Sequence, residues 1–149
     1  MKNFDPITVN GFGDEWSSYQ QENYVDLRNA FERYFSIFPW ELIDDQSEGF
    51  DMGCGSGRWA RFVAPNVGRL NCIDASCKAL DVARSNLRDF NNCTFEHSIV
   101  EECSLSDNTQ DFGYSLGVLH HIPDTLGAMK QCVSKLKHGA PFLVYIYYR

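Results

Sequence analysis

Three segments of the chain carry apolar residues at three- and four-residue steps, the spacing of an amphipathic helix. The first segment runs from Glu22 to about Phe38, and Pro39 ends it because proline cannot continue a helix. The second begins after Ser76 and the third after Asp124, both of which are residue types that cap helices. Their inward faces are expected to consist of Leu80, Ala83 and Leu87 in the second helix, and of Leu126, Met129, Val133 and Leu136 in the third.

Five short apolar segments predict β-strands that alternate with these helices and with a shorter helix at Arg58–Val63. The strands are expected at a segment through Phe50, at Leu70–Asp74, at Cys93–Ser98, at Asp111–Leu119 and at 141–148. The last is apolar at nearly every position, as a strand buried on both faces would be. This alternation predicts an α/β fold, a doubly wound, mostly parallel Rossmann-like sheet of about five strands with helices on both faces and an N-terminal helical arm.

The length of 149 residues is enough for one domain with a substantial core. We expect residues 1–45 to form the N-terminal arm and helix, and residues 46–149 to form the Rossmann-like domain. In such sheets ligands bind beyond the carboxyl ends of the strands.

Charge excludes some classes of partner. The net charge is −7, acidic residues outnumber basic ones 20 to 13, and Lys and Arg form no run. Tight binding to a nucleic-acid backbone usually needs a basic face, so nucleic acid is not an expected partner.

No stretch approaches the roughly 18–20 uncharged apolar residues of a membrane span, and the N-terminus does not begin as a signal peptide does. The sequence predicts a cytoplasmic protein without membrane contact.

The cysteine pattern indicates free thiols. None of the six cysteines forms a Cys-x-x-Cys pair, and none has a histidine at the spacing of zinc ligands. Cysteine is among the most buried residue types. We therefore expect mostly buried, unpaired thiols and no metal site.

A glycine cluster, Gly53-Cys54-Gly55-Ser56-Gly57, follows the first predicted strand. Glycines there let the backbone approach a ligand that a Cβ atom would push away. Asp51 precedes the cluster, and a carboxylate at the mouth of this loop would repel a pyrophosphate and attract a cation. The glycine spacing also differs from the Gly-x-Gly-x-x-Gly dinucleotide fingerprint, which disfavours an NAD-dependent dehydrogenase. The alternative role for Asp51 is to cap the following turn.

Asp74 ends the next strand, about 20 residues on, where a carboxylate can accept both ribose hydroxyls of an adenosine. Its alternative role is to cap the helix that follows. Acidic residues at the ends of two adjacent strands together point to a positively charged adenosine. S-adenosylmethionine, which carries an ammonium and a sulfonium, is such a molecule.

These segments resemble the class I S-adenosylmethionine-dependent methyltransferases, in the branch that acts on small molecules. Residues 50–59 resemble the first motif of that family, residues 72–76 its ribose-binding motif, and residues 111–124 its fourth-strand motif. The similarity extends over about 48–148. It implies S-adenosyl-L-methionine as the cofactor and a small-molecule methyl acceptor.

The resemblance also implies roles for single residues. The loop residues Gly53, Cys54, Gly55 and Gly57 would pack on the methionine part, and Asp51 would act by its charge and by ordering this loop. Asp74 would hold the ribose, Ala75 would pack near the adenine, and the backbone at Leu116 would accept a hydrogen bond from the methionine ammonium.

Adenine recognition is where the chain departs from the family, because Ile99 occupies a position that often carries an aspartate. Ser98, Ile99 and Val100 could sandwich the ring and offer a backbone N–H, and Glu101 is an alternative partner for the exocyclic amine.

The N-terminal segment with Trp16 and Tyr19 resembles an arm that closes over the cofactor in related enzymes. A cation–π contact with the sulfonium would suit either side chain. The alternative is that both aromatics only anchor the arm to the core.

His120 and His121 follow the fourth strand, at the rim of the expected site. A hydroxyl or amine acceptor benefits from a general base, for which histidine is the usual residue, so both are candidate catalytic residues. Their alternative role is packing or hydrogen bonding at the start of the helix.

Members of the family usually continue past the fifth strand with a further helix and an antiparallel pair of strands, whereas this sequence stops at Arg149. It is therefore either a fragment or a truncated sheet, and the alternative to an active methyltransferase is a cofactor-binding or interaction module without turnover. The segment 141–148 would then be an uncovered edge strand through which two copies could pair as a homodimer.

Overall fold

The computed structural model describes residue 3, residues 5–9, residue 11 and residues 24–147. In this part of the chain a five-stranded sheet has the order β3-β2-β1-β4-β5, and every neighbouring pair is parallel. The strands are β1 (Glu48–Met52), β2 (Arg69–Asp74), β3 (Cys93–His97), β4 (Phe112–Leu116) and β5 (Phe142–Tyr145). The predicted fold class is confirmed.

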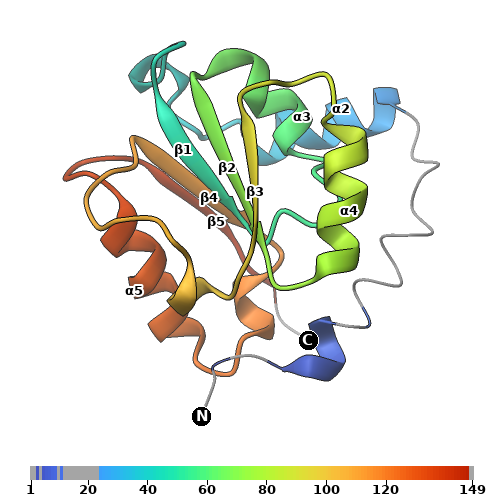
Figure 1. Cartoon of the computed structure of the whole chain (residues 1–149). Helices are drawn as coiled ribbons and strands as arrows, with labels where there is room; N and C mark the ends of the chain where they lie inside the picture. The colour runs from blue at the N-terminus through green and yellow to red at the C-terminus, as the bar shows by residue number, and fades with distance from the viewer. Residues whose placement is uncertain (1–2, 4, 10, 12–23, 148–149) are drawn as a thin grey trace.

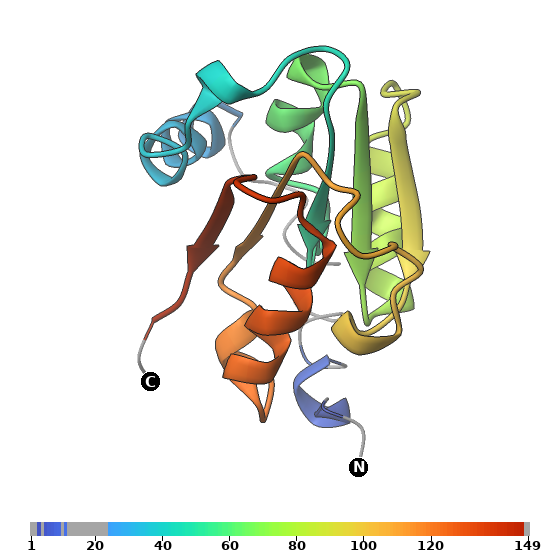
Figure 2. The same cartoon turned by 90° about the vertical axis from the view of Figure 1, so that its left-hand side faces the viewer.

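Helices cover both faces of the sheet, as a doubly wound fold requires. They are α2 (Tyr24–Tyr34), α3 (Ala60–Val63), α4 (Cys77–Asn86) and α5 (Thr125–Lys135). In Figure 1, α2, α3 and α4 lie on one side of the sheet and α5 lies on the other, and the rotated view in Figure 2 shows the same layers. The chain runs outward from β1 to β3 and returns to β4 on the other side of β1. This reversal places a crevice at the carboxyl end of β1, where ligands of such folds bind.

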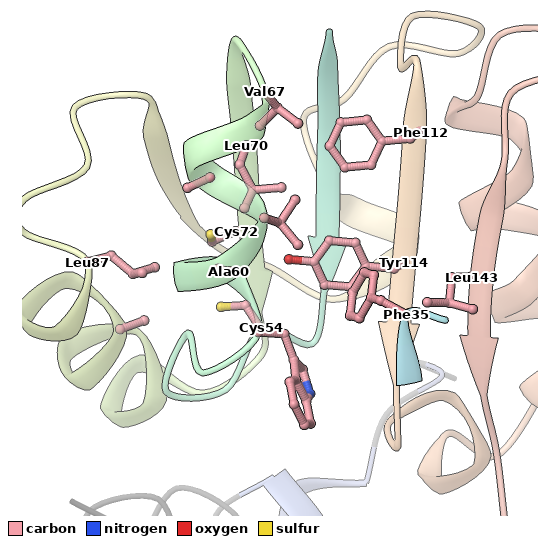
Figure 3. Packing of buried hydrophobic residues seen from close by; sticks show 14 of the residues in the cluster. Phe35, Cys54, Ala60, Val67, Leu70, Cys72, Leu87, Phe112, Tyr114 and Leu143 are labelled. Atoms are coloured by element: carbon pink, nitrogen blue, oxygen red, sulfur yellow. The ribbon is translucent and has the colours of Figure 1, made fainter. Parts of the chain in front are cut away.

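Alternation of side chains along the strands divides the core in two. Phe50 and Met52 of β1 face α5 and pack with its buried residues. The opposite face holds the larger cluster, which also takes in aromatic residues from α2 and the turn after it. Figure 3 shows part of this cluster, with Phe35 beside Tyr114, whose ring centroids are 5.2 Å apart. Asp51 alternates with Phe50 and Met52, so its side chain belongs to the α2, α3 and α4 side.

The first predicted helix is shorter than its apolar pattern. Helix α2 ends at Tyr34, and turns continue the chain toward Pro39. Phe35 and Phe38 are nevertheless buried, because the turn residues direct their rings into the same core. The apolar pattern is therefore correct for Leu27, Phe35 and Phe38, but it is wrong for Tyr24, which is 50% exposed, and for the end of the helix.

The third predicted helix, α5, is rotated relative to the expectation. Leu126 and Val133 were expected to face inward, but they are 62% and 53% exposed. The other two predicted positions, Met129 and Leu136, do pack in the core, and Ala128 and Cys132 are fully buried beside them. The small side chains of Ala128 and Cys132 allow α5 to lie close to the sheet. The larger side chains of Leu126 and Val133 therefore lie on the exposed side of the helix. The predicted caps are confirmed, since Ser76 accepts from the N–H of Ala79 and Asp124 from that of Gly127.

The fourth and fifth strands are shorter than predicted. β4 ends at Leu116 because Gly117 has a φ of +75°, and a 3₁₀ turn over Leu119–His121 follows. The expectation that the last strand is buried on both faces is wrong. β5 lies at the edge of the sheet, where only Leu143 is buried. An apolar sequence at 142–145 therefore does not distinguish a strand inside the sheet from a strand at its edge.

Cysteine burial is mixed. Cys54, Cys72 and Cys132 are buried, Cys93 and Cys103 are partly buried, and Cys77 is exposed, all as free thiols. Among the described residues, no helix has both the length and the apolar character that a membrane crossing needs.

Candidate functional site

A cavity of about 310 Å³ opens at the carboxyl ends of the central strands. Nine of the residues expected to form the site line it: Gly53, Cys54, Gly55, Asp74, Ala75, Ile99, Val100, Leu116 and His121. Asp51, Gly57 and His120 are not among the lining residues. Trp16 and Tyr19 lie outside the described residues. The cavity thus brings together residues that follow β1, β2 and β4, which lie far apart in the sequence.

The glycine loop needs glycine for two different reasons. Gly53 has a φ of +78°, and a Cβ atom there would come within 2.5 Å of the Val118 side chain. Gly57 has a φ of +75°, and its Cβ would come within 2.7 Å of Leu87, which belongs to the core next to α4. Gly53 therefore shapes the cavity wall, whereas Gly57 allows the loop to pack against the end of α4.

Asp74 connects the glycine loop to the start of α4. Its Oδ2 accepts a hydrogen bond from the N–H of Gly55 at 2.8 Å, and its Oδ1 accepts one from the N–H of Ser76 at 2.8 Å. Burial raises the pKa of Asp74, and these N–H groups act in the opposite direction. The helix cap itself is Ser76, so Asp74 is not needed for capping.

A carboxylate has about four acceptor positions, and the backbone N–H groups of Gly55, Ser76 and Ala75 do not use all of them. Because Asp74 lines the cavity, its remaining acceptor capacity faces the space where a ligand would lie.

Asp51 lies beneath the loop and not at its mouth, which corrects the expectation from sequence. Strand β1 extends through Met52, so Asp51 sits inside the sheet, in register with Cys72 on β2 and Tyr114 on β4, and is 1% exposed. Burial raises its pKa to about 8, while the hydroxyl of Tyr114 lowers it and the charge of Asp74 raises it further. Its Oδ2 has no hydrogen-bond partner in the described part of the chain. The two acids lie on the same side of the sheet and interact electrostatically.

The adenine end of the expected site consists of backbone and apolar side chains. Ile99 and Val100 line the cavity where β3 gives way to a 3₁₀ turn. Glu101 is not a lining residue, and its Oε1 accepts a hydrogen bond of 2.8 Å from Asn3. Of the two predicted partners for an adenine, the backbone at 99–100 borders the cavity and Glu101 does not.

The two histidines have different positions. His121 lines the cavity, and its Nε2 lies 3.4 Å from the hydroxyl of Tyr147. The ring of His120 lies between those of His121 and Tyr147, with centroid distances of 4.0 and 4.1 Å. Of the two, His121 is placed to meet a ligand, and His120 packs behind it.

Several cavity residues escaped the sequence prediction. Arg58 lines the cavity directly after the glycine loop, with its guanidinium carbon 4.3 Å from the centre of the Trp59 ring. Tyr34 from α2 and Tyr145 from β5 line it as well, with ring centroids 4.8 Å apart. The position of Arg58 beside the loop was a usable signal, but nothing local indicated that Tyr34 and Tyr145 meet.

The described N-terminal residues also reach the cavity. Asn3, Asp5, Thr8 and Val9 are among its lining residues. Asn3 bonds to the backbone of Asp124 through both its donor, at 3.1 Å, and its acceptor, at 2.7 Å. The described part of the predicted arm is thus fastened to the start of α5.

The site offers no metal centre within the residues that the structure describes, where no three His, Cys, Asp or Glu side chains gather. What it offers is hydrogen bonding, a cationic Arg58 and an apolar wall, which are features of a site for an organic ligand.

Comparison with known proteins places these features in a family. A family model described as "Methyltransferase domain" matches residues 50–144, which include the glycine loop, Asp74 and most of the five strands. A ubiquinone biosynthesis O-methyltransferase from Vibrio parahaemolyticus serotype O3:K6 is 26% identical over 148 residues, covering 93% of this chain and 61% of the relative. The chain therefore spans about three fifths of the length of this curated relative.

Solved structures share the fold. The YcgJ protein from Bacillus subtilis superposes with a TM-score of 0.67 at 21% identity, covering 82% of this chain and 50% of the other. Phosphoethanolamine N-methyltransferase 1 from Haemonchus contortus, solved with phosphoethanolamine and S-adenosylhomocysteine, gives a TM-score of 0.69 at 13% identity, covering 92% and 31%. With its matched domain, its parallel sheet and its glycine loop, the chain belongs to the methyltransferase-domain family of class I S-adenosylmethionine-dependent methyltransferases.

Proposed function

We propose that this chain binds S-adenosyl-L-methionine and transfers its methyl group to a small-molecule acceptor. The carboxylate of Asp74 carries the proposal, because it fixes the glycine loop through Gly55 and still has acceptor capacity facing the cavity. Membership of the methyltransferase-domain family supports the same cofactor.

The cavity residues match the parts of this cofactor. Asp74 would accept from the ribose hydroxyls, and Ile99 and Val100 would enclose the adenine. Arg58 carries the positive charge that a methionine carboxylate requires, and the backbone at Leu116 would accept from the ammonium. When bound, the cofactor supplies an electrophilic methyl group on a sulfonium. The chain's own contribution is alignment and exclusion of water, which account for much of the rate of such displacements.

We propose a hydroxyl group as the acceptor, with His121 as its general base. The curated relative is named for O-methyl transfer in ubiquinone biosynthesis, which supports a hydroxyl. The cavity rim beside His121 is aromatic, formed by Tyr34, Tyr145 and Tyr147. Aromatic rims suit a planar acceptor such as a phenol. His121 would take the hydroxyl proton while the packed rings keep water away.

The test has two stages. Titration calorimetry with S-adenosylmethionine should give binding in the micromolar range, and absence of heat with intact, folded protein would refute the proposed cofactor. Formation of S-adenosylhomocysteine is then measured over a panel of phenols and catechols, with aliphatic amines for comparison. Turnover confined to amines would contradict the proposed hydroxyl acceptor but would leave the proposed cofactor unaffected.

The second candidate is a cofactor-binding or interaction module without turnover. The chain spans about three fifths of its curated relative, so turnover by this chain has to be measured separately from cofactor binding. Binding without turnover by this chain, with turnover restored in any longer natural version, would establish it.

We also propose that β5 mediates self-association. It pairs with β4 on one side only in the described part of the molecule, and Tyr145, Ile146 and Tyr147 are 38%, 49% and 46% exposed. An apolar edge strand favours pairing with another chain. Light scattering over a range of concentrations should show dimers, and a monomer at the highest concentration would contradict the proposal.

Two further expectations belong to the proposal. The net charge of −7 supports a protein that does not bind nucleic acid, and retention on a DNA column at physiological salt would contradict this. The cytoplasmic location stays a prediction, testable by fractionation of cells that produce the protein.

A further inference from the structure

Outside the cavity, a cysteine and a histidine form a close pair at the ends of two neighbouring strands. Asp74 of β2 and His97 of β3 are in register. Cys77 follows Asp74 by one short turn and begins α4, so its thiol reaches the imidazole of His97. The distance from Cys77 Sγ to His97 Nδ1 is 3.1 Å, and both residues are exposed.

The second nitrogen of the imidazole is held by the backbone. His97 Nε2 lies 3.0 Å from the carbonyl oxygen of Ala75. A carbonyl oxygen can only accept, so Nε2 carries the hydrogen and donates it. In the neutral ring Nδ1 is then the acceptor, and the thiol of Cys77 donates to it. The result is a nucleophile, a base and a group that orients the base, the arrangement that activates nucleophiles in proteins.

We propose that Cys77 is a modification site at which the thiol, activated by His97, reacts with low-molecular-weight disulfides. The thiol proton moves to His97 Nδ1, and the Cys77 sulfur attacks one sulfur of the disulfide. A new S–S bond forms, the original one breaks, and the departing half leaves as a thiolate that takes up the proton. The disulfide is the oxidant, so the step needs no other reactant.

The surroundings favour charge separation between the two side chains. Cys77 stands at the N-terminus of α4, a helix of 10 residues, where the positive end of the helix dipole stabilises a thiolate. The imidazolium formed on His97 lies close enough to the carboxylate of Asp74 to interact with its charge.

The other thiols lack these features. Cys54, Cys72 and Cys132 are buried. Cys54 also lines the cavity, but its burial raises the pKa of its thiol to about 11. Burial raises the pKa of Cys103 and raises that of Cys132 to about 12, which suppresses their thiolates. The hydrogen bond with Cys72, together with burial, raises the pKa of the partly buried Cys93. The structure therefore predicts one fast thiol among the six.

The experiment measures the rate at which each cysteine of the reduced, folded chain reacts with glutathione disulfide. Cys72 and Cys77 share a tryptic peptide, so fragment spectra are needed to assign the adduct. The same measurement in urea gives the reactivity of each thiol without structure. Cys77→Ser, His97→Gln and His138→Gln are compared, the last replacing an exposed histidine away from Cys77.

We expect Cys77 to react about tenfold faster in the folded chain than in urea, and His97→Gln to remove this advantage. His138→Gln should react as the unsubstituted chain does, and Cys77→Ser should lose the fast phase. Glutamine can still donate to the Ala75 carbonyl but cannot take a proton, so circular dichroism should show intact folding. The proposal is overturned if Cys77 reacts no faster folded than unfolded. It is equally overturned if folded His97→Gln keeps the full rate.

Discussion

Asp74 accepts a hydrogen bond of 2.8 Å from the backbone N–H of Gly55, which ties the glycine loop after β1 to the end of β2. One side chain thus orders the loop and presents acceptor positions to the cavity. The consequence is that cofactor affinity and loop order should be lost together when this carboxylate is removed.

Replacing Asp74 by alanine should reduce S-adenosylmethionine affinity by at least about 100-fold. The ribose would lose its acceptor, and the N–H groups of Gly55 and Ser76 would lose their partner, a cost of about 1–3 kcal/mol for each buried unsatisfied group. Titration calorimetry measures the affinity, and urea unfolding measures the stability. Asp81→Ala, at an exposed acid on α4, is the matched control. An Asp74→Ala variant that binds normally would rule out the ribose role.

Replacing Asp51 by asparagine should remove a pH dependence of stability. The folded chain holds the Asp51 proton up to a pKa of about 8, whereas the unfolded chain releases it near pH 4. Unfolding therefore releases a proton between these values, and the free energy of unfolding falls as pH rises, by about 1.4 kcal/mol per pH unit from this group. Urea unfolding at several pH values from 5 to 8 (roughly the window set by these pKa values) should show a flatter profile for Asp51→Asn. If the unsubstituted chain and Asp51→Asn showed the same dependence of stability on pH, Asp51 would not be the group responsible.

The same group predicts proton release on cofactor binding. A cationic ligand near Asp51 favours its charged form, so binding at pH 7 should displace the proton that burial retains. Calorimetry in two buffers of different ionisation enthalpy measures the number of protons released. If the apparent enthalpy of binding were the same in both buffers, no proton would be released and Asp51 would keep its protonation state.

Substituting His121 by asparagine should lower kcat by about 10²- to 10⁴-fold for a hydroxyl acceptor while leaving S-adenosylmethionine affinity unchanged, because only the proton transfer is lost. His138→Asn, at an exposed position after α5, provides the control. Activity is followed as formation of S-adenosylhomocysteine. A full rate in His121→Asn would exclude this histidine as the base.

Changing Asn3 to alanine should speed dissociation of the cofactor. The two hydrogen bonds between Asn3 and the backbone of Asp124 hold the N-terminal residues over the cavity, and each contributes about 0.5–1.5 kcal/mol. Stopped-flow dissociation measures the effect, which should amount to several-fold. An unchanged rate would indicate that these residues do not retain the ligand.

The rotated contact face of α5 predicts unequal effects of two substitutions. Ala128→Leu adds bulk at a fully buried position and should destabilise the fold by about 1–3 kcal/mol. Leu126→Ala removes an exposed side chain and should change stability by no more than about 0.5 kcal/mol. Urea unfolding distinguishes them. If Leu126→Ala destabilised the fold more than Ala128→Leu does, Leu126 would be the buried residue, as the sequence predicted.

The sequence alone determined the order of strands and helices, the caps at Ser76 and Asp124, and the glycine loop followed by Asp74. These features depend on local chemistry, since periodicity, capping and backbone freedom are set by neighbours along the chain. Most of the expected cofactor residues reach the cavity because the carboxyl ends of parallel strands share one edge of the sheet.

Only the tertiary structure decided which residues meet across the sheet. It buried Asp51 beneath the loop, turned Ala128 and not Leu126 toward the core, and brought Tyr34 from α2 beside Tyr145 from β5. It also placed Cys77 against His97, 20 positions away. The physical reason is that helix rotation, strand ends and side-chain contacts follow from how volumes pack between layers, and packing is a property of residues that are distant in sequence.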